Sequence, residues 1–252
     1  MLANRPYAIS IAGFDPSAGA GILADVKCFE QHQVYGFGIC SALTVQTDKE
    51  FLKNNWLNSS QIMEQLEPLI AQFKVSACKI GLIKDVSVLL EVVSFLRSKS
   101  SDLKIIVDPV LKASSGYEFH DWANGMEMLS PVLKQIDLIT PNYNEMLSLG
   151  GQTTDADSIA RLWSNYCPVL LKGGHSITAL GTDYLYEQDD IYKFAPQVNK
   201  VHQKHGSGCV LSGAIAANLA LGHSLKQACS NAKVYIEKFL NSNNTLLGYH
   251  SL

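Results

Sequence analysis

Short apolar runs rich in β-branched residues alternate along the chain with longer segments in which apolar residues recur at helical spacing. The runs Ile105–Val107 and Val169–Leu171 are continuously apolar, which is typical of strands covered on both faces. Strands that alternate with helices through short connections predict a mainly parallel sheet flanked by helices. The predicted strands are Tyr7–Ala12, Ile39–Gln46, Ala77–Gly81, Lys104–Asp108, Asp137–Thr140 and Val169–Lys172.

The amphipathic segments between these strands predict the helices Gly19–Gln33, Ser59–Phe73, Asp85–Lys99, Trp122–Lys134, Asn142–Gly150 and Asp155–Tyr166. An antiparallel hairpin at one edge of the sheet is predicted by Thr182–Tyr186 and Ile191–Phe194, which flank the acidic turn Glu187–Asp190. Two long helices, Gly208–Leu221 and Ser224–Asn241, follow the hairpin. Since no repeat or linker interrupts the pattern, we expect residues 1–252 to form a single α/β domain with helices on both faces of the sheet.

Composition and charge exclude several classes of function. The chain is 47% hydrophobic and 17% charged, and its 20 Lys+Arg and 23 Asp+Glu residues give a net charge of -3. Because no basic cluster is present, we do not expect nucleic acid as a partner. No segment approaches the roughly 20 apolar residues that cross a bilayer, and the N-terminus has no signal-peptide pattern. We therefore expect a cytoplasmic protein without a membrane partner.

The spacing of the six cysteines indicates their redox state. None forms a C-x-x-C pair, so structural zinc is not expected. In a chain of this length the spacing is typical of reduced thiols. They are Cys28, Cys40, Cys78, Cys167, Cys209 and Cys229.

The loop Lys204–Cys209 precedes an alanine-rich helix and is a candidate anion site. Glycines before a helix let backbone N–H groups converge on a phosphate, and the helix dipole favours its charge. The chain contains no Gly-Lys pair and hence no Walker A loop. The position of Cys209 predicts a lowered thiol pKa, although no His–Asn or His–Asp pair identifies a covalent nucleophile. A tight turn that simply requires glycine is the alternative.

Three further strand ends carry candidate residues. Lys172, which precedes Gly173 and Gly174, has the charge to neutralise a migrating phosphoryl group; a surface lysine beside a turn is the alternative. Asn142 and Glu145 in Thr-Pro-Asn-x-x-Glu predict a helix capping box, or a site where Glu145 holds the hydrated Mg²⁺ of a nucleotide. Asp108 ends the central strand, where it either positions water or metal or caps the turn.

The loop Gly13–Gly21 also lies at a strand end. Gly19, Gly21 and Ala24 match the dinucleotide pattern G-x-G-x-x-A. The length of the loop, its Asp-Pro interruption and the lack of a good ribose partner after the next strand oppose that interpretation. A substrate-facing loop is favoured, with Asp25 one helical turn further along; a solvated helix face is the alternative for Asp25.

Together, these segments resemble the ribokinase superfamily and, within it, the hydroxymethylpyrimidine/phosphomethylpyrimidine kinases of thiamine biosynthesis. The resemblance extends over nearly the whole chain and keeps the order of the motifs. The segments that carry it are Ala12–Asp25, Val45–Gln46, Lys79–Leu82, Val107–Gly116, Thr140–Glu145, Lys172–His175 and His205–Ser212.

The resemblance implies ATP- and Mg²⁺-dependent phosphorylation of 4-amino-5-hydroxymethyl-2-methylpyrimidine and of its monophosphate, on a ribokinase-like fold and as a homodimer. Cys209 stands where most superfamily members have an aspartate base, as in the pyrimidine and related pyridoxal kinases. Without that carboxylate, we expect catalysis to rest on positioning and charge neutralisation. The resemblance implies four groups of site residues. The anion hole consists of Gly206, Gly208 and Cys209, assisted by Lys172, and the nucleotide contacts come from Asn142, Lys172, Gly174, Ser207 and Gly208. The metal contacts come from Glu145 and Asp108, and the pyrimidine pocket consists of Gly13, Asp25, Gln46, Leu82 and Val110.

Several departures and rival functions accompany the resemblance. Phe14 replaces a small Thr or Ser, Ala18 a common Gly and Val210 a Thr, while Tyr117 ends a stretch that lacks the family's Lys-Ser-Gly-Asp. Pyridoxal kinase is the nearest rival, and Gln46 disfavours it because pyridoxal-preferring relatives tend to lack this glutamine. An NAD(P)-dependent oxidoreductase and a non-catalytic nucleotide-binding protein are more distant rivals.

Overall fold

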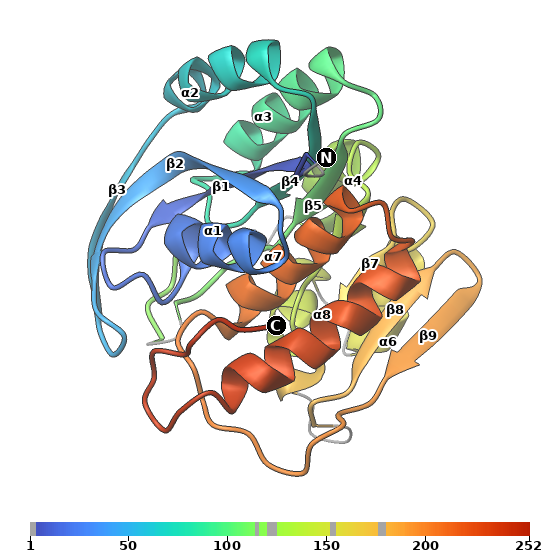
Figure 1. The fold of residues 1–252 in the computed structure, drawn as a ribbon. Coiled ribbons are helices and arrows are strands. Elements are labelled where there is room, and N and C mark those ends of the chain that lie inside the picture. Colours follow the sequence, from blue (N-terminus) through green and yellow to red (C-terminus); the bar gives the residue numbers. More distant parts are fainter. Residues whose placement is uncertain (1–3, 114–115, 120–124, 152–154, 176–179) are drawn as a thin grey trace.

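The computed structural model describes residues 4–113, 116–119, 125–151, 155–175 and 180–252. Nine strands in this part of the chain form one sheet (Figure 1). Six neighbouring strands are parallel, one antiparallel strand lies at one edge, and an antiparallel hairpin lies at the other. The order across the sheet is β3 (Phe51–Trp56), β2 (Tyr35–Gln46), β1 (Tyr7–Phe14), β4 (Val75–Ile80), β5 (Lys104–Val107), β6 (Leu138–Ile139), β7 (Val169–Leu171), β8 (Asp183–Glu187) and β9 (Asp190–Phe194).

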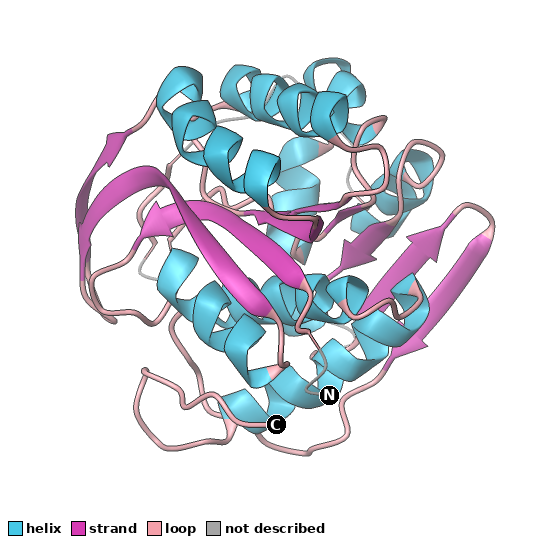
Figure 2. Cartoon of the chain, turned by 45° about the horizontal axis from the view of Figure 1, so that its top comes forward, coloured by secondary structure: helices cyan, strands magenta, loops and turns pink. Residues whose placement is uncertain are grey.

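Helices cover both faces of the sheet (Figure 2). One face packs against α1 (Gly21–Gln31), α7 (Ser207–Ala220) and α8 (Leu225–Leu240). The other packs against α2 (Ser59–Gln72), α3 (Val86–Lys99), α4 (Gly125–Leu133), α5 (Tyr143–Leu149) and α6 (Ala156–Trp163). A single 3₁₀ turn, η1 (Gly173–His175), follows β7. The predicted α/β class is confirmed.

The two apolar cores explain the continuously apolar strands. Ile105 and Val107 pack into the cluster under α2–α6, whereas Ile106 between them packs against α1, α7 and α8. Leu170 likewise faces the second core, while its neighbours Val169 and Leu171 face the first. Successive side chains of a strand point to opposite faces, so a strand covered on both sides needs apolar residues at every position.

Several element boundaries differ from the sequence prediction. β3 was not predicted, because Lys53, Asn54 and Asn55 are poor strand formers that pair here with the end of β2. β2 begins at Tyr35 instead of Ile39, and α1 begins at Gly21 instead of Gly19. Of the predicted helix Trp122–Lys134, residues 122–124 lie outside the described part of the chain.

The predicted edge hairpin is confirmed. Glu187 and Asp190, expected in its turn, pair with each other as the last rung of the ladder. No helix in the described part of the chain combines the length and apolar composition that crossing a bilayer requires.

Candidate active site

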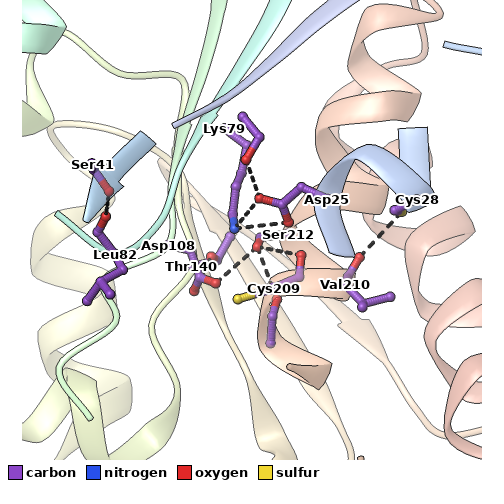
Figure 3. Close-up of polar contacts among 12 residues, drawn as sticks. Asp25, Cys28, Ser41, Lys79, Leu82, Asp108, Thr140, Cys209, Val210 and Ser212 are labelled. Carbon is purple, nitrogen blue, oxygen red and sulfur yellow. Dashed lines mark hydrogen bonds and ion pairs between the residues drawn. The ribbon is translucent and has the colours of Figure 1, made fainter. Parts of the chain in front are cut away.

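Six polar side chains from five elements converge at the carboxyl ends of the central strands (Figure 3). Parallel strands bring their carboxyl ends to one edge of the sheet, where α/β proteins bind their ligands. The converging groups shown there are Lys79 of β4, Asp25 of α1, Asp108 after β5, Thr140 after β6, and Cys209 and Ser212 of α7.

Asp108 contacts three other residues of this polar cluster. Its Oδ1 lies 2.7 Å from Lys172 Nζ and accepts a hydrogen bond of 3.1 Å from Thr140 Oγ1. Its Oδ2 accepts from Ser212 Oγ at 3.0 Å. Burial opposes ionisation, but the charges of Lys172 and Lys79 and these hydrogen bonds outweigh it, so the pKa of Asp108 is lowered. Asp108 is therefore a carboxylate whose oxygens both have protein partners.

Lys172 is a buried ammonium, since its exposed fraction is only 8%. The alternative of a surface lysine is wrong. Burial would lower its pKa, but Asp108 and Glu145 outweigh burial and the pKa is raised. A Cβ added at Gly208 would lie 3.5 Å from Lys172 Nζ, so this charge sits beside the first turn of α7. The structure thus brings Lys172 to the glycine loop, and the contact of either with a phosphoryl group remains a prediction.

Asn142 and Glu145 form the predicted capping box of α5. Asn142 Oδ1 accepts from the Glu145 backbone N–H at 2.9 Å, and Glu145 Oε2 accepts from the Asn142 backbone N–H at 2.7 Å. The same Oε2 lies 3.8 Å from Lys172 Nζ. Burial raises the pKa of Glu145 to about 7, with Lys172 opposing and Asp108 adding to the shift. The capping carboxylate thus also belongs to the charged cluster and titrates near neutral pH.

The N-terminus of α7 is open toward this cluster. Gly206 is its N-cap residue, has no side chain to bond the first N–H groups, and adopts φ 73°. A Cβ there would lie 2.1 Å from the Gly19 carbonyl oxygen, so only glycine fits this turn. The first N–H groups of a helix lack intrahelical partners. In α7 these groups belong to Ser207, Gly208 and Cys209, which are half-exposed, so their backbone N–H groups are available as donors to an anion. The requirement for glycine in a tight turn is therefore confirmed, and binding of an anion by these N–H groups remains a prediction.

The thiol of Cys209 does not have the predicted lowered pKa. Burial raises the pKa, and the carboxylates of Asp25 and Asp108 raise it further. Lys79 and the Gly21 backbone N–H lower it by less. The prediction was wrong because a position at a helix N-terminus says nothing about burial or about carboxylates from other elements. Cys209 is a neutral thiol at pH 7.

Asp25 lies wholly inside the protein, beneath α7. It has no exposed surface and accepts from Lys79 Nζ at 2.8 and 3.1 Å and from Ser10 Oγ at 2.5 Å. The alternative of a solvated helix face is wrong. Lys79 is also fully buried; burial opposes its charge, but the Asp25 carboxylate outweighs burial and the pKa of Lys79 is raised. Direct contact of Asp25 with a pyrimidine remains a prediction.

Three of the five predicted pocket residues, Gly13, Gln46 and Leu82, lie together at and just beyond the carboxyl ends of β1, β2 and β4. A Cβ added at Gly13 would lie 3.0 Å from Leu82 Cδ2 and 3.3 Å from Thr44 Cγ2. Gln46 Nε2 donates to Thr44 Oγ1 at 2.9 Å, which places the Gln46 amide in this group. The Leu82 carbonyl accepts a hydrogen bond from Ser41 Oγ (Figure 3). Val110 is half-buried and follows Asp108, to whose carbonyl its N–H donates.

The glycines that suggested dinucleotide binding have other uses. A Cβ at Gly19 would lie 2.5 Å from His205 Cδ2, and one at Gly21 would lie 2.1 Å from the Gly13 carbonyl. Their missing side chains therefore accommodate loop packing. Gly173 is similar, since its Cβ would meet the Thr182 backbone at 1.8 Å, whereas a Cβ at Gly174 would meet nothing within 4 Å.

The departures from the family pattern have distinct environments. Val210 of α7 is fully buried in the apolar cluster that α1, α7 and α8 form on one face of the sheet. Phe14 is 40% exposed at the end of β1. The ring of Tyr117 lies 4.6 Å from that of Phe51 in β3. Ala18 adopts φ 57°, a left-handed conformation that suits the glycine more common there.

Sequence reasoning missed several residues of the cluster. Lys79 had a usable signal, because a lysine in an otherwise apolar strand needs a buried partner. Thr140 and Ser212 had none, since ordinary hydroxyl residues at a strand end and in a helix carry no distinctive spacing. Asp15 and His205, whose Oδ2 and Nε2 lie 2.9 Å apart, are 190 residues apart in the chain and were not connected.

Comparisons with known proteins agree with this geometry. The family model described as phosphomethylpyrimidine kinase matches residues 15–251. The hydroxymethylpyrimidine/phosphomethylpyrimidine kinase of Aquifex aeolicus is 34% identical over 252 residues, which cover 96% of this chain and 97% of that protein. The protein of the same name from Staphylococcus aureus (strain MRSA252) is 31% identical over 91% of this chain and 86% of its own length.

Solved structures are similar over the same length. The phosphomethylpyrimidine kinase of Clostridium difficile is 29% identical with a TM-score of 0.75, over 92% of this chain and 98% of that one. The pyridoxal kinase of Staphylococcus aureus in complex with ADP has a TM-score of 0.81 at 22% identity, over 95% of this chain and 89% of that one. At that identity the second comparison shows a shared ribokinase-like fold.

Proposed function

This chain belongs to the phosphomethylpyrimidine kinase family, and we propose that it transfers the γ-phosphoryl group of ATP to the hydroxymethyl group of 4-amino-5-hydroxymethyl-2-methylpyrimidine. It then phosphorylates the resulting monophosphate, in thiamine biosynthesis. The observation that carries the proposal is the position of the Lys172 ammonium beside the first turn of α7, whose N-cap Gly206 offers no side chain to the first N–H groups.

The chain's own groups supply positioning and charge for this transfer. The N–H groups of Gly208 and Cys209 point along the α7 dipole, which favours a phosphoryl group at that end. Lys172 adds a positive charge in a buried setting, where electrostatic stabilisation is stronger than in water. Because the Cys209 thiol is neutral, it donates or packs and does not remove the hydroxyl proton. This suits a loose transition state, which needs little help from a base.

Mg²⁺ fits the charge of the cluster. Asp108 and the ionised form of Glu145 supply two carboxylates beside the single ammonium group of Lys172, whereas Asp25 and Lys79 form a separate, fully buried pair. No cluster of three or more His, Cys, Asp or Glu in the described residues forms a metal cage by itself. Mg²⁺ is usually held by one or two carboxylates together with nucleotide phosphates and water, a role for Glu145 assisted by Asp108. When bound, it would neutralise charge on the phosphates.

The substrate side is suited to an aminopyrimidine edge. One N–H of Gln46 bonds Thr44, which fixes the amide and leaves its oxygen and second N–H for a ligand. The oxygen would accept from the exocyclic amino group while the N–H donates to a ring nitrogen. Gly13 lets the Leu82 and Thr44 side chains pack close to its backbone, which would shape one wall of the pocket. Asn142, Ser207 and Gly174 would face the nucleotide in this arrangement.

The test is ADP release from Mg-ATP with the pyrimidine alcohol, its monophosphate, pyridoxal or no acceptor. We expect rapid turnover with the first two and slow turnover with pyridoxal. The Lys172→Ala protein, purified in the same way, controls for contaminating kinases. Faster turnover with pyridoxal contradicts the substrate assignment, and no ADP with any acceptor favours a non-catalytic nucleotide-binding protein.

We also propose a homodimer in the cytoplasm. Leu43 and Val45 of β2 and Leu52 of β3 are 51%, 40% and 63% exposed, and such apolar side chains on neighbouring strands suit a self-complementary interface. The six free thiols match the cysteine use of proteins in reducing compartments. Sedimentation equilibrium tests the first part, since a Leu52→Lys variant should shift the protein to monomer.

A further inference from the structure

Asp15 and His205 connect two loops that line the active site. Asp15 directly follows β1, and His205 directly precedes Gly206 at the start of α7. His205 Nε2 lies 2.9 Å from Asp15 Oδ2, and the two side chains are 6% and 1% exposed. The contact therefore joins the substrate-side loop to the anion-binding loop inside the protein.

Asp15 also holds its own loop together. Its carboxylate accepts from the Ser17 backbone N–H at 2.9 Å, from Ser17 Oγ at 2.8 Å and from the Ala20 backbone N–H at 2.9 Å. Burial opposes ionisation, but the hydrogen bonds from His205, Ser17 and Ala20 outweigh it and lower the pKa of Asp15. Because an ionised carboxylate only accepts, His205 Nε2 is the donor.

The backbones of the two loops touch at this bridge. Gly19 leaves the space that the His205 ring occupies, and Gly206 approaches the Gly19 carbonyl so closely that a Cβ would lie 2.1 Å away. Two residues beyond Gly19, the Gly21 N–H points at the Cys209 thiol and lowers its pKa slightly. A shift of either loop would therefore move the thiol and the first amides of α7 together.

The other nitrogen of the His205 ring has no partner. Of the side-chain nitrogen and oxygen atoms buried within the described residues, only His205 Nδ1 and Asn54 Nδ2 lack a hydrogen bond. Leaving such an atom unpaired costs about 1–3 kcal/mol, so an apolar residue would serve packing alone better. A histidine here indicates that the bond from Nε2 to Asp15 is what the position requires.

We propose that His205 is a positioning residue, which through Asp15 fixes the substrate-side loop against the N-terminus of α7. The inference rests on the proposed phosphoryl transfer. It adds that one charge-assisted hydrogen bond aligns the acceptor side with the phosphoryl side. Phosphoryl transfer depends mainly on such alignment, and a displacement of 1 Å can cost about 10²-fold in rate.

The test compares three variants at His205. His205→Leu fills the space without a donor, and we expect kcat to fall about 10²-fold with smaller changes in both KM values. His205→Gln carries an amide nitrogen near the Nε2 position and should recover most of kcat. In His205→Asn the amide nitrogen lies near the Nδ1 position and does not reach Asp15, so this variant should not recover kcat. Equal kcat for the Gln and Asn variants, or wild-type kcat for His205→Leu, overturns the proposal.

A second measurement does not depend on the substrate. Iodoacetamide labelling of Cys209, followed by peptide mass spectrometry on the folded protein without ligands, reports how tightly the two loops are joined. We expect severalfold faster labelling in His205→Leu than in the wild type, even if the proposed acceptor is wrong. Equal labelling rates overturn the bridge itself.

His32→Leu is the matched control. His32 is also buried, and its Nδ1 donates one hydrogen bond of 2.8 Å to the Cys28 carbonyl at the end of α1. This variant should keep the wild-type kcat and the wild-type protection of Cys209. If it loses both as His205→Leu does, the effect belongs to any buried histidine and the proposal fails.

Discussion

Lys172 Nζ lies 2.7 Å from Asp108 Oδ1, although 64 residues separate the two in the chain. Lys172 follows β7 and Asp108 follows β5, so the parallel sheet itself brings them together. Glu145 lies within 3.8 Å of the same ammonium, which makes Lys172 the shared counterion of two carboxylates. An incoming phosphate adds more negative charge here, which is why the ammonium and a divalent cation are both expected to act on it.

Replacement of Lys172 tests this role. In Lys172→Ala we expect kcat to fall about 10²–10³-fold, because a preorganised charge at the transferring group is lost. The KM for the pyrimidine should change far less, since the proposed pyrimidine pocket is formed by Gly13, Gln46 and Leu82 and not by Lys172. Steady-state ADP release with both substrates varied measures each quantity.

Arg97→Ala provides the control for breaking an ion pair elsewhere in the fold. Arg97 Nη2 lies 2.5 Å from Oδ2 of Asp137, which directly precedes β6 at the edge of the sheet opposite the active-site cluster. Its loss should lower the melting temperature without a comparable effect on kcat. An unchanged rate in Lys172→Ala refutes the assigned role of Lys172.

The pH dependence of stability tests the environment of Glu145. Burial raises the pKa of this carboxyl from 4.5 to about 7, so the folded chain holds the proton more tightly than the unfolded chain does. Its contribution to the free energy of unfolding is therefore complete below pH 4.5 and is lost as the pH rises through about 7. Glu145→Gln should flatten this slope in urea titrations of the ligand-free protein.

The glutamine variant is informative because it keeps an oxygen for the capping box of α5. Metal-nucleotide binding, measured by calorimetry between pH 6 and 8, should tighten with pH in the wild type, because the carboxyl must lose its proton to act on the cation. The variant should lose this dependence. Parallel pH profiles for the two proteins would argue against Glu145 as a metal contact.

Gln46 is expected to set the choice of acceptor. Gln46→Met removes the amide and keeps a similar length, so kcat/KM for the pyrimidine alcohol should fall about 10–10²-fold through loss of hydrogen bonds. The rate with pyridoxal should change much less, so the ratio of the two measures the effect. If both rates fall by the same factor, Gln46 has a structural role in the sheet and does not determine which substrate ring is bound.

Ala18→Gly should stabilise the protein. At φ 57° an alanine costs about 1–2 kcal/mol, while glycine loses about 0.4–1 kcal/mol through its freer unfolded chain, which leaves a gain of about 0.5–1 kcal/mol. Ala20→Gly is the control, because Ala20 has φ −136° and gains nothing from glycine. Thermal unfolding distinguishes the two, and equal melting temperatures for both variants contradict the strain at Ala18.

The sequence predicted those parts of the site that depend on local pattern. The capping box of Asn142 and Glu145 has a fixed spacing, and Lys172 and Asp108 directly follow apolar runs that read as strands. The buried pair of Lys79 and Asp25 and the bridge of Asp15 and His205 depend on distant segments, which no spacing reveals. The same limit explains β3, whose asparagines are held in a strand by the end of β2, and Cys209, whose pKa is set by burial.

The most direct test of the central claim is a crystal structure of the protein with a non-hydrolysable ATP analogue and the pyrimidine alcohol. The account predicts that the terminal phosphate accepts hydrogen bonds from the backbone N–H groups of Gly208 and Cys209 and lies beside Lys172 Nζ. It also predicts the aminopyrimidine edge on Gln46. A terminal phosphate bound away from both the α7 N-terminus and Lys172 would contradict it.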